Sequence, residues 1–198
     1  KIYSNFYAFA AVKADGSITT WGNSDDGGSG APSDSGYVNI YSTGYAFAAV
    51  RADGSITAWG RSNSGGIGAP SDSGYVNIYS TDSAFAALKA DGSISAWGSS
   101  AYGGSGAPSD NGYIKIYSTE GAFAALKADG SITAWGSSAY GSSGAPTDDG
   151  YIKIYSTEYA FAAIKADGSI TTWGDSDAGG SGAPSGSRYR FERLLELN

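Results

Sequence analysis

One unit of 38 residues is repeated five times along this chain of 198 residues. The tryptophans lie one period apart, at Trp21, Trp59, Trp97, Trp135 and Trp173. The Asp-Gly pairs and the prolines keep the same spacing, and no loop gains or loses a residue between copies. A fixed period of this length indicates a propeller, a solenoid or an array, in which each unit completes its core against its neighbours.

The domain organisation follows from the repeat. We expect one domain over residues 1–187, with units at about 1–38, 39–76, 77–114, 115–152 and 153–187. Residues 188–198 leave the pattern and have apolar residues at helical spacing, so we expect a terminal cap or a short helix there. A linker helix to another domain or to an assembly partner is the alternative. Because the chain starts without Met, we expect a mature or excised segment.

Each unit is expected to contain three or four short strands. Residues 112–118 alternate in polarity, so Ile114 and Ile116 are expected to face the core together. Residues 122–128 are rich in alanine, but they are short and run into an Asp-Gly hairpin signal, so we interpret them as a strand. Small side chains there would let neighbouring sheets approach closely. Residues 131–136 form the next strand, and a Gly- and Ser-rich loop follows.

Composition narrows the classes of function. The chain has no Cys, His or Met, so disulfides and thiol chemistry are excluded. A net charge of −7, with the 12 Lys and Arg residues spread through the repeats, argues against a nucleic-acid partner and an anionic membrane surface. No apolar run approaches the roughly 18 residues of a membrane helix, so membrane insertion is not expected.

The order of elements in the unit resembles the regulator of chromosome condensation repeat. Residues 122–136 show its features, which are a strand ending in Ala-Leu-Lys, an Asp-Gly turn and a strand ending in Trp-Gly. The period is similar to that of short blades in secreted bacterial propellers of that superfamily, which include a β-lactamase-inhibitor protein. Ser118-Thr119 and Ala122-Phe123 depart from the Gly and His usual in the family, which is mostly seven-bladed. The resemblance implies a propeller fold and indicates little about the function of the chain.

We therefore expect an all-β fold, a five-bladed β-propeller, with an open β-solenoid and a C-terminal cap as the alternative. Candidate ligand-binding residues lie in the two segments that vary most between copies, because loops on a rigid scaffold commonly carry recognition. They are Asp25, Asp26, Asn63, Tyr102, Tyr140 and Asp177 after the Trp-Gly pairs, and Tyr45 and Tyr159 after the first strands. The alternatives are solvated loops without a ligand and simple packing at a sheet edge.

Strict repetition of the tryptophans favours packing between units over stacking on sugars. Asp25, Asp26 and Asp34 offer oxygen ligands for Ca²⁺, but Pro32 occupies the slot where calcium repeats have Asp, so no cofactor is expected. Without His and Cys, and with no position before residues 188–198 that breaks the repeat symmetry, an enzyme is not expected.

The function that fits these features is non-enzymatic recognition, outside a bacterial cell or at its surface. The expected partner is a glycan or a protein, bound through the variable loops. The alternative is a structural spacer or self-assembling unit of a larger surface protein or filament, for which self-association would be the sign.

Overall fold

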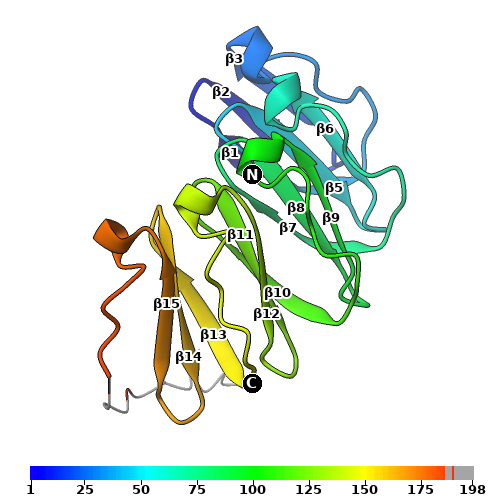
Figure 1. The fold of residues 1–198 in the computed structure, drawn as a ribbon. Coiled ribbons are helices and arrows are strands. Elements are labelled where there is room, and N and C mark those ends of the chain that lie inside the picture. The colour runs from blue at the N-terminus through cyan, green and yellow to red at the C-terminus, as the bar shows by residue number, and fades with distance from the viewer. Residues whose placement is uncertain (186–188, 190–198) are drawn as a thin grey trace.

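The computed structural model describes residues 1–185 and Tyr189, and these residues form five antiparallel sheets of three strands each (Figure 1). The strands are Ile2–Ser4 (β1), Ala8–Val12 (β2), Ile18–Gly22 (β3), Tyr37–Ser42 (β4), Ala46–Arg51 (β5), Ile56–Gly60 (β6), Tyr75–Ser80 (β7), Ala84–Lys89 (β8), Ile94–Gly98 (β9), Tyr113–Ser118 (β10), Ala122–Lys127 (β11), Ile132–Gly136 (β12), Tyr151–Ser156 (β13), Ala160–Lys165 (β14) and Ile170–Gly174 (β15). Each sheet contains the three strands of one repeat, in sequence order.

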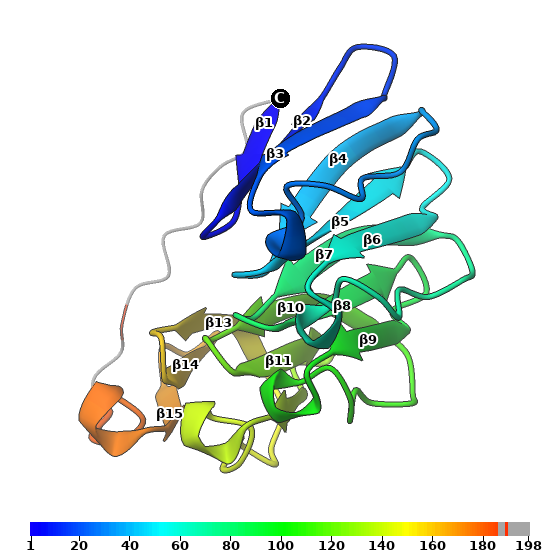
Figure 2. The ribbon, with the colours of Figure 1, turned by 90° about the horizontal axis from the view of Figure 1, so that it is seen from above.

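We call the sheets blades one to five in chain order. Figure 2 shows that they fan around a common axis instead of stacking in a row, with blades one and five at the two ends of an arc. The expected all-β fold with propeller blades is therefore confirmed. The expected cap or helix at residues 188–198 lies outside the described residues except for Tyr189.

The expectation that Ile114 and Ile116 share the core side was wrong. Ile116 is buried, whereas Ile114 is exposed. The pairing of β10 with β11 shifts between Tyr113 and Lys115, which is the signature of a β-bulge. An extra residue in one strand breaks the period of two, so Tyr113 takes the buried place that simple alternation assigns to Ile114.

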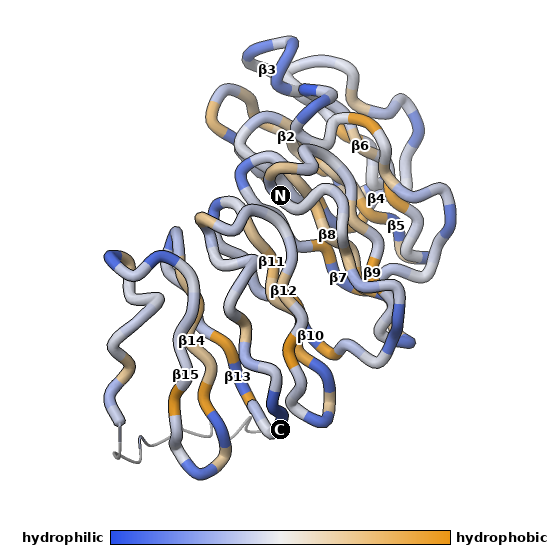
Figure 3. The backbone as a smooth tube through the Cα atoms, in the orientation of Figure 1, coloured by the Kyte–Doolittle hydropathy of each residue, from blue (hydrophilic) through white to orange (hydrophobic). Residues whose placement is uncertain are grey.

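The core lies between consecutive blades. In blade two, Phe47 stacks on Trp59 with ring centroids 5.3 Å apart. This pair packs on Ala8 and Ala10 of blade one, and all four residues are buried. The same arrangement repeats at the next three interfaces, and Figure 3 shows hydrophobic residues along the strands. The prediction that alanines allow close approach of the sheets is confirmed, and the tryptophans of blades two to five are core residues.

The Asp-Gly turns require glycine for two reasons. At Gly54, φ is +80°, a conformation that residues with a side chain rarely adopt. A Cβ at this position would also lie 2.4 Å from the backbone nitrogen of Tyr75. Asp53 accepts hydrogen bonds from the backbone and hydroxyl of Ser55 and thereby closes the turn. The turn thus holds the start of the next blade against the hairpin.

At the end of each blade opposite the Asp-Gly turn, a 3₁₀ helix follows the third strand. The sequence predicted only an irregular loop there. The five helices are Ser24–Asp26, Ser62–Ser64, Ser100–Tyr102, Ser138–Tyr140 and Ser176–Ala178. In blade two, the Thr43 hydroxyl donates to the carbonyl of Ser64 at 3.0 Å and accepts from the Ala46 backbone. These bonds tie the helix to the turn after the first strand, so two variable segments form one surface.

Candidate functional site

This surface, which we call the loop face, consists of the five 3₁₀ helices and the turns between the first and second strands. It surrounds the axis, where a cavity of about 690 Å³ opens between the blades. All five blades contribute to the cavity wall, which consists of residues 4–6, 42–44, 80–82, 118–120 and 156–158. The cavity is therefore a product of the whole arc and belongs to no single repeat.

A line of backbone hydrogen bonds forms the rim of the cavity. Each turn of blades one to four donates one N–H to the carbonyl of the equivalent turn in the next blade. The pairs are Phe6 to Gly44 at 3.2 Å, and Gly44 to Asp82, Asp82 to Glu120 and Glu120 to Glu158 at 2.9 Å each. Because these bonds fix the turn backbones, the side chains on them have set positions around the cavity.

Three of those side chains are carboxylates at equivalent positions, Asp82, Glu120 and Glu158. Burial raises the pKa of Asp82, and the nearby charge of Glu158 raises it further. The pKa of Glu120 is also raised, first by burial and then by the charges of Asp82 and Glu158. The carboxylates thus repel one another in this part of the wall, and a cation beside them would relieve that repulsion.

A first aromatic cluster lies beside the cavity on blades one and two. Tyr7 and Tyr45 stack with centroids 5.9 Å apart, and Phe6 meets Tyr45 edge to face at 5.6 Å. The guanidinium of Arg61 lies 4.4 Å from the centroid of the Tyr45 ring. Phe6 and Tyr7 are exposed, which leaves apolar surface at the rim.

A second aromatic cluster lies on blades three to five and contains three of the predicted binding residues. Tyr140 stacks on Tyr159 at 5.2 Å and meets Tyr102 at 6.2 Å. The ring of Tyr140 covers Gly121, where a Cβ would lie 2.7 Å from it. The charge of Glu120 raises the pKa of Tyr159, so the cluster directly adjoins the acidic wall.

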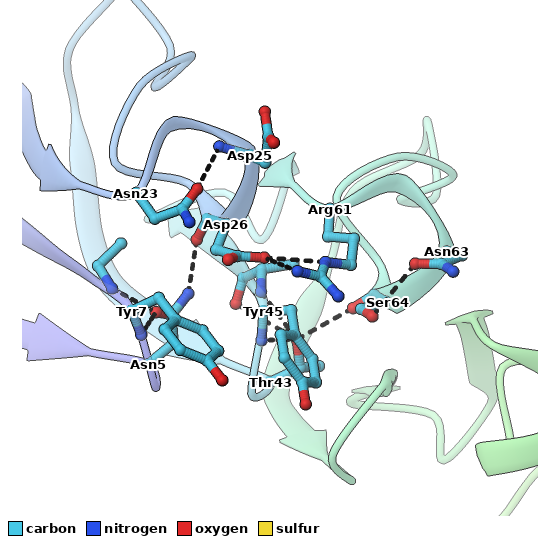
Figure 4. Close-up of polar contacts among 12 residues, drawn as sticks. Asn5, Tyr7, Asn23, Asp25, Asp26, Thr43, Tyr45, Arg61, Asn63 and Ser64 are labelled. Carbon is cyan, nitrogen blue, oxygen red and sulfur yellow. Dashed lines mark hydrogen bonds and ion pairs between the residues drawn. The ribbon is translucent and has the colours of Figure 1, made fainter.

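Asp26 is placed differently from the expectation that it faces a ligand. Its side chain is buried and forms an ion pair with Arg61 at 2.8 Å across the interface of blades one and two (Figure 4). Its carbonyl accepts a hydrogen bond from the side chain of Asn5 at 2.7 Å. Asp26 therefore holds two blades together, and Arg61 is the residue that presents its charge at the surface.

The remaining predicted residues are exposed on the 3₁₀ helices and do not gather. They are Asp25, Asn63 and Asp177. The backbone N–H groups of Asp25 and Asp177 donate to the side chains of Asn23 and Asp175, and both residues are exposed to solvent. Asp34 pairs with Arg51, away from Asp26, and no group of three metal-ligating residues occurs in residues 1–185.

Asp82, Glu120 and Glu158 were not predicted from the sequence as site residues. The available signal was an acidic residue at the same repeat position in three copies, directly before the selected Tyr159 in one of them. The opposite end of the blades carries a repeated structural contact instead. There Tyr113 and Lys127 both bind Asp110, and equivalent trios follow in blades two, three and five.

Comparison with known proteins identifies the fold. No family model and no curated protein matches the chain, and none of its described helices is long and apolar enough to cross a membrane. The ectodomain of the Arabidopsis thaliana receptor kinase ACR4 has a TM-score of 0.60 at 16% identity, over 87% of this chain and 64% of that chain. Prp20p from Saccharomyces cerevisiae has a TM-score of 0.56 at 14% identity, over 88% and 57%.

Yeast RCC1 (Prp20), solved bound to Kap60, gives a TM-score of 0.57 at 19% identity, over 88% of this chain and 56% of that chain. At these identities the likeness shows the fold, an RCC1-like β-propeller repeat. The chain spans about three-fifths of the length of the structures it matches.

Proposed function

We propose that this chain is a non-enzymatic protein-binding module that receives a basic segment of its partner at the loop face. The observation that carries the proposal is the acidic cavity wall, formed by Asp82, Glu120 and Glu158 at equivalent turns and flanked by two aromatic clusters. In the expected setting the module is secreted or displayed at a bacterial cell surface.

The chemistry of the loop face favours Lys or Arg side chains as the bound groups. The pKa values of Asp82 and Glu120 are raised by burial and then by the charges of neighbouring carboxylates, and a cation beside these groups would stabilise their charged forms. Tyrosine rings at the rim add cation–π attraction and interface contacts. The net charge of −7 would also steer a basic partner towards the chain at low ionic strength.

A protein partner is favoured over a glycan for two reasons. Tyr140 has an aromatic neighbour on either side, Tyr102 and Tyr159, which reduces the ring area free for a sugar. In addition, Prp20p is described as binding Gsp1p and histones, and it has been solved with Kap60. Those partners belong to Prp20p, and they support only the idea that propellers of this type serve as surfaces for proteins.

The test is titration of the chain with synthetic peptides that contain Lys and Arg, scored by calorimetry at two salt concentrations. The triple variant Asp82→Asn, Glu120→Gln, Glu158→Gln is expected to lose at least tenfold in affinity. A matched control removes the same charge at the opposite end, through Asp72→Asn, Asp110→Asn and Asp148→Asn. Equal binding by the two triple variants would overturn the proposal.

A further inference from the structure

Blade one exposes a face that every later blade buries. Phe9 and Trp21 stack on each other, as the other pairs do, but they are 45% and 44% exposed. Their equivalents in blade two, Phe47 and Trp59, are 0% and 4% exposed. We call Phe9 and Trp21 the plug, because the equivalent Phe-Trp pairs of blades two to five pack against the preceding blade.

In the described part of the chain, blade five has a site of the matching kind that no side chain fills. A cavity of about 130 Å³ lies between Tyr155, Ala162 and Gly179 on its outer face. We call these three residues the socket. An apolar cavity of roughly 150 Å³ holds a benzene ring, so the space suits one aromatic side chain.

The inner interfaces show what occupies a socket. A Cβ on Gly27 would lie 2.7 Å from the Phe47 ring, and a Cβ on Gly103 would lie 2.7 Å from the Phe123 ring. The phenylalanine of the next blade therefore rests directly on this glycine. Among the residues that the structure describes, no atom lies within 4 Å of the same position at Gly179.

Hydrogen-bonding groups at the two ends match as well. In blades two to five each tryptophan Nε1 donates to the carbonyl of this glycine in the preceding blade, at 3.0 to 3.1 Å. Within residues 1–185, Trp21 has no such acceptor and the Gly179 carbonyl has no such donor. At the cavity rim, the Glu158 N–H and the Phe6 carbonyl are the two ends of the line of backbone bonds.

We infer that the plug of one copy of this chain docks in the socket of a second copy. The contact would continue an interface that occurs four times inside the chain, with the same rings, glycine carbonyl and backbone donors. Plug and socket are different surfaces, so the association is head to tail. Such a contact closes into a ring when the rotation per copy allows it and otherwise grows as an open filament.

The backbone at Tyr189 repeats a contact that is found where each of blades two to five begins. Tyr189 N–H donates to the Gly168 carbonyl at 3.3 Å, as Tyr151 donates to Gly130 at 3.2 Å where a new blade begins. The path of the chain at this residue is therefore that of a blade boundary. The inference does not depend on the proposed ligand, because the plug and the socket lie on the outer faces of the end blades.

The experiment is sedimentation of the whole chain over a wide concentration range, with two variants. Phe9→Ser with Trp21→Ser removes the plug, and Ala162→Glu places a charge in the socket. Tyr155→Glu is a second socket variant, should Ala162→Glu fail to fold by circular dichroism. Ile67→Ser is the matched control, because Ile67 is an exposed apolar residue elsewhere and its equivalents are Ser29 and Ser105.

We expect the mass of the unaltered chain and of the Ile67→Ser control to rise with concentration. Each plug or socket variant alone should remain a monomer. An equimolar mixture of the two should pair once and stop at a dimer, since it offers one intact plug and one intact socket. A monomer at every concentration, assembly unchanged by the variants, or a mixture that does not pair would each overturn the inference.

Discussion

The Phe-Trp pair of blade one and that of blade three have the same sequence and geometry but opposite surroundings. Phe9 and Trp21 stack at 5.3 Å, and Phe85 and Trp97 stack at 5.1 Å. Only the second pair has a neighbouring blade against it, and it is buried. The residues that form the core of a blade are therefore buried only when the adjacent blade packs against them. Stability in this chain is therefore a property of interfaces between repeats.

The largest expected difference comes from removing the two phenylalanines. Phe85→Ala should lower the free energy of unfolding by about 3–5 kcal/mol, because it leaves a cavity in a packed interface. Phe9→Ala should cost about 1 kcal/mol, since roughly half of the ring is already in water. Urea denaturation at a protein concentration that keeps the chain monomeric measures both. Equal losses would contradict the comparison.

Two glycines allow the same test at a single position, because they share a backbone conformation and differ only in the side chains that contact them. Gly103 and Gly179 have φ values of 91° and 96°, so alanine strains both by about 1–2 kcal/mol. At Gly103 the new methyl would also collide with Phe123. Gly103→Ala should therefore cost about 1–3 kcal/mol more than Gly179→Ala in thermal unfolding. If the two alanines cost the same, blade five does not carry an empty socket.

The ion pairs at the two ends of the blades are expected to contribute differently to the free energy of unfolding. Arg61→Ala leaves the buried Asp26 carboxylate without its partner and should lower the free energy of unfolding by about 2 kcal/mol. Arg51→Ala frees Asp34, which lies in solvent and keeps a hydrogen bond from Tyr37, and its effect should be much smaller. Chemical denaturation of the two variants measures both losses. A larger loss for Arg51→Ala than for Arg61→Ala would contradict this ranking of the two ion pairs.

The smallest expected effects concern pH, and their signs are opposite at the two ends. Hydrogen bonds from Lys127 and Tyr113 lower the pKa of Asp110 below 3.8, so its contribution is present above that pH and is lost as the pH falls through the folded pKa. Burial raises the pKa of Asp82 above 3.8, so the folded state gains stability as Asp82 takes up a proton.

Melting temperatures between pH 7 and pH 3 test this difference. Asp110→Asn should lower the melting temperature at neutral pH and reduce the loss of stability in acid. Asp82→Asn should raise the melting temperature at neutral pH. The same sign for both variants at neutral pH would show that the environments of the two carboxylates have been misassigned.

Much of the fold was predictable from the sequence, because the repeat puts the same local signals in register five times. The Asp-Gly hairpins, the alanine-rich strands and the packing of four tryptophans follow from local pattern and the need to bury apolar surface. The β-bulge at Ile114 was not predictable from alternation, since an inserted residue is fixed by pairing with β11. The exposure of Trp21 was missed because its sequence context is that of a core residue, and it is exposed because no blade among residues 1–185 packs against it.

The candidate site was predicted only in part. All four predicted tyrosines lie on the loop face, because two variable segments of each blade meet there, but Tyr45 belongs to the first aromatic cluster and Tyr102, Tyr140 and Tyr159 form the second. Asp26 was wrongly predicted to face a ligand. Its buried ion pair with Arg61 joins residues about one repeat apart in the sequence, and a short-range sequence pattern does not reveal such a contact. The cavity carboxylates depend on how five turns converge on one axis, which is a property of the assembled arc.

The solvent accessibility of Trp21 decides whether blade one has an open face while the equivalent faces of blades two to five are covered. Acrylamide quenching of tryptophan fluorescence would be measured on dilute protein, for the unaltered chain and for Trp21→Phe. The account predicts that one of the five tryptophans is quenched readily and that Trp21→Phe removes this fraction and leaves four protected. Five equally protected tryptophans in the dilute monomer would contradict it, because blade one would then be covered by the chain itself.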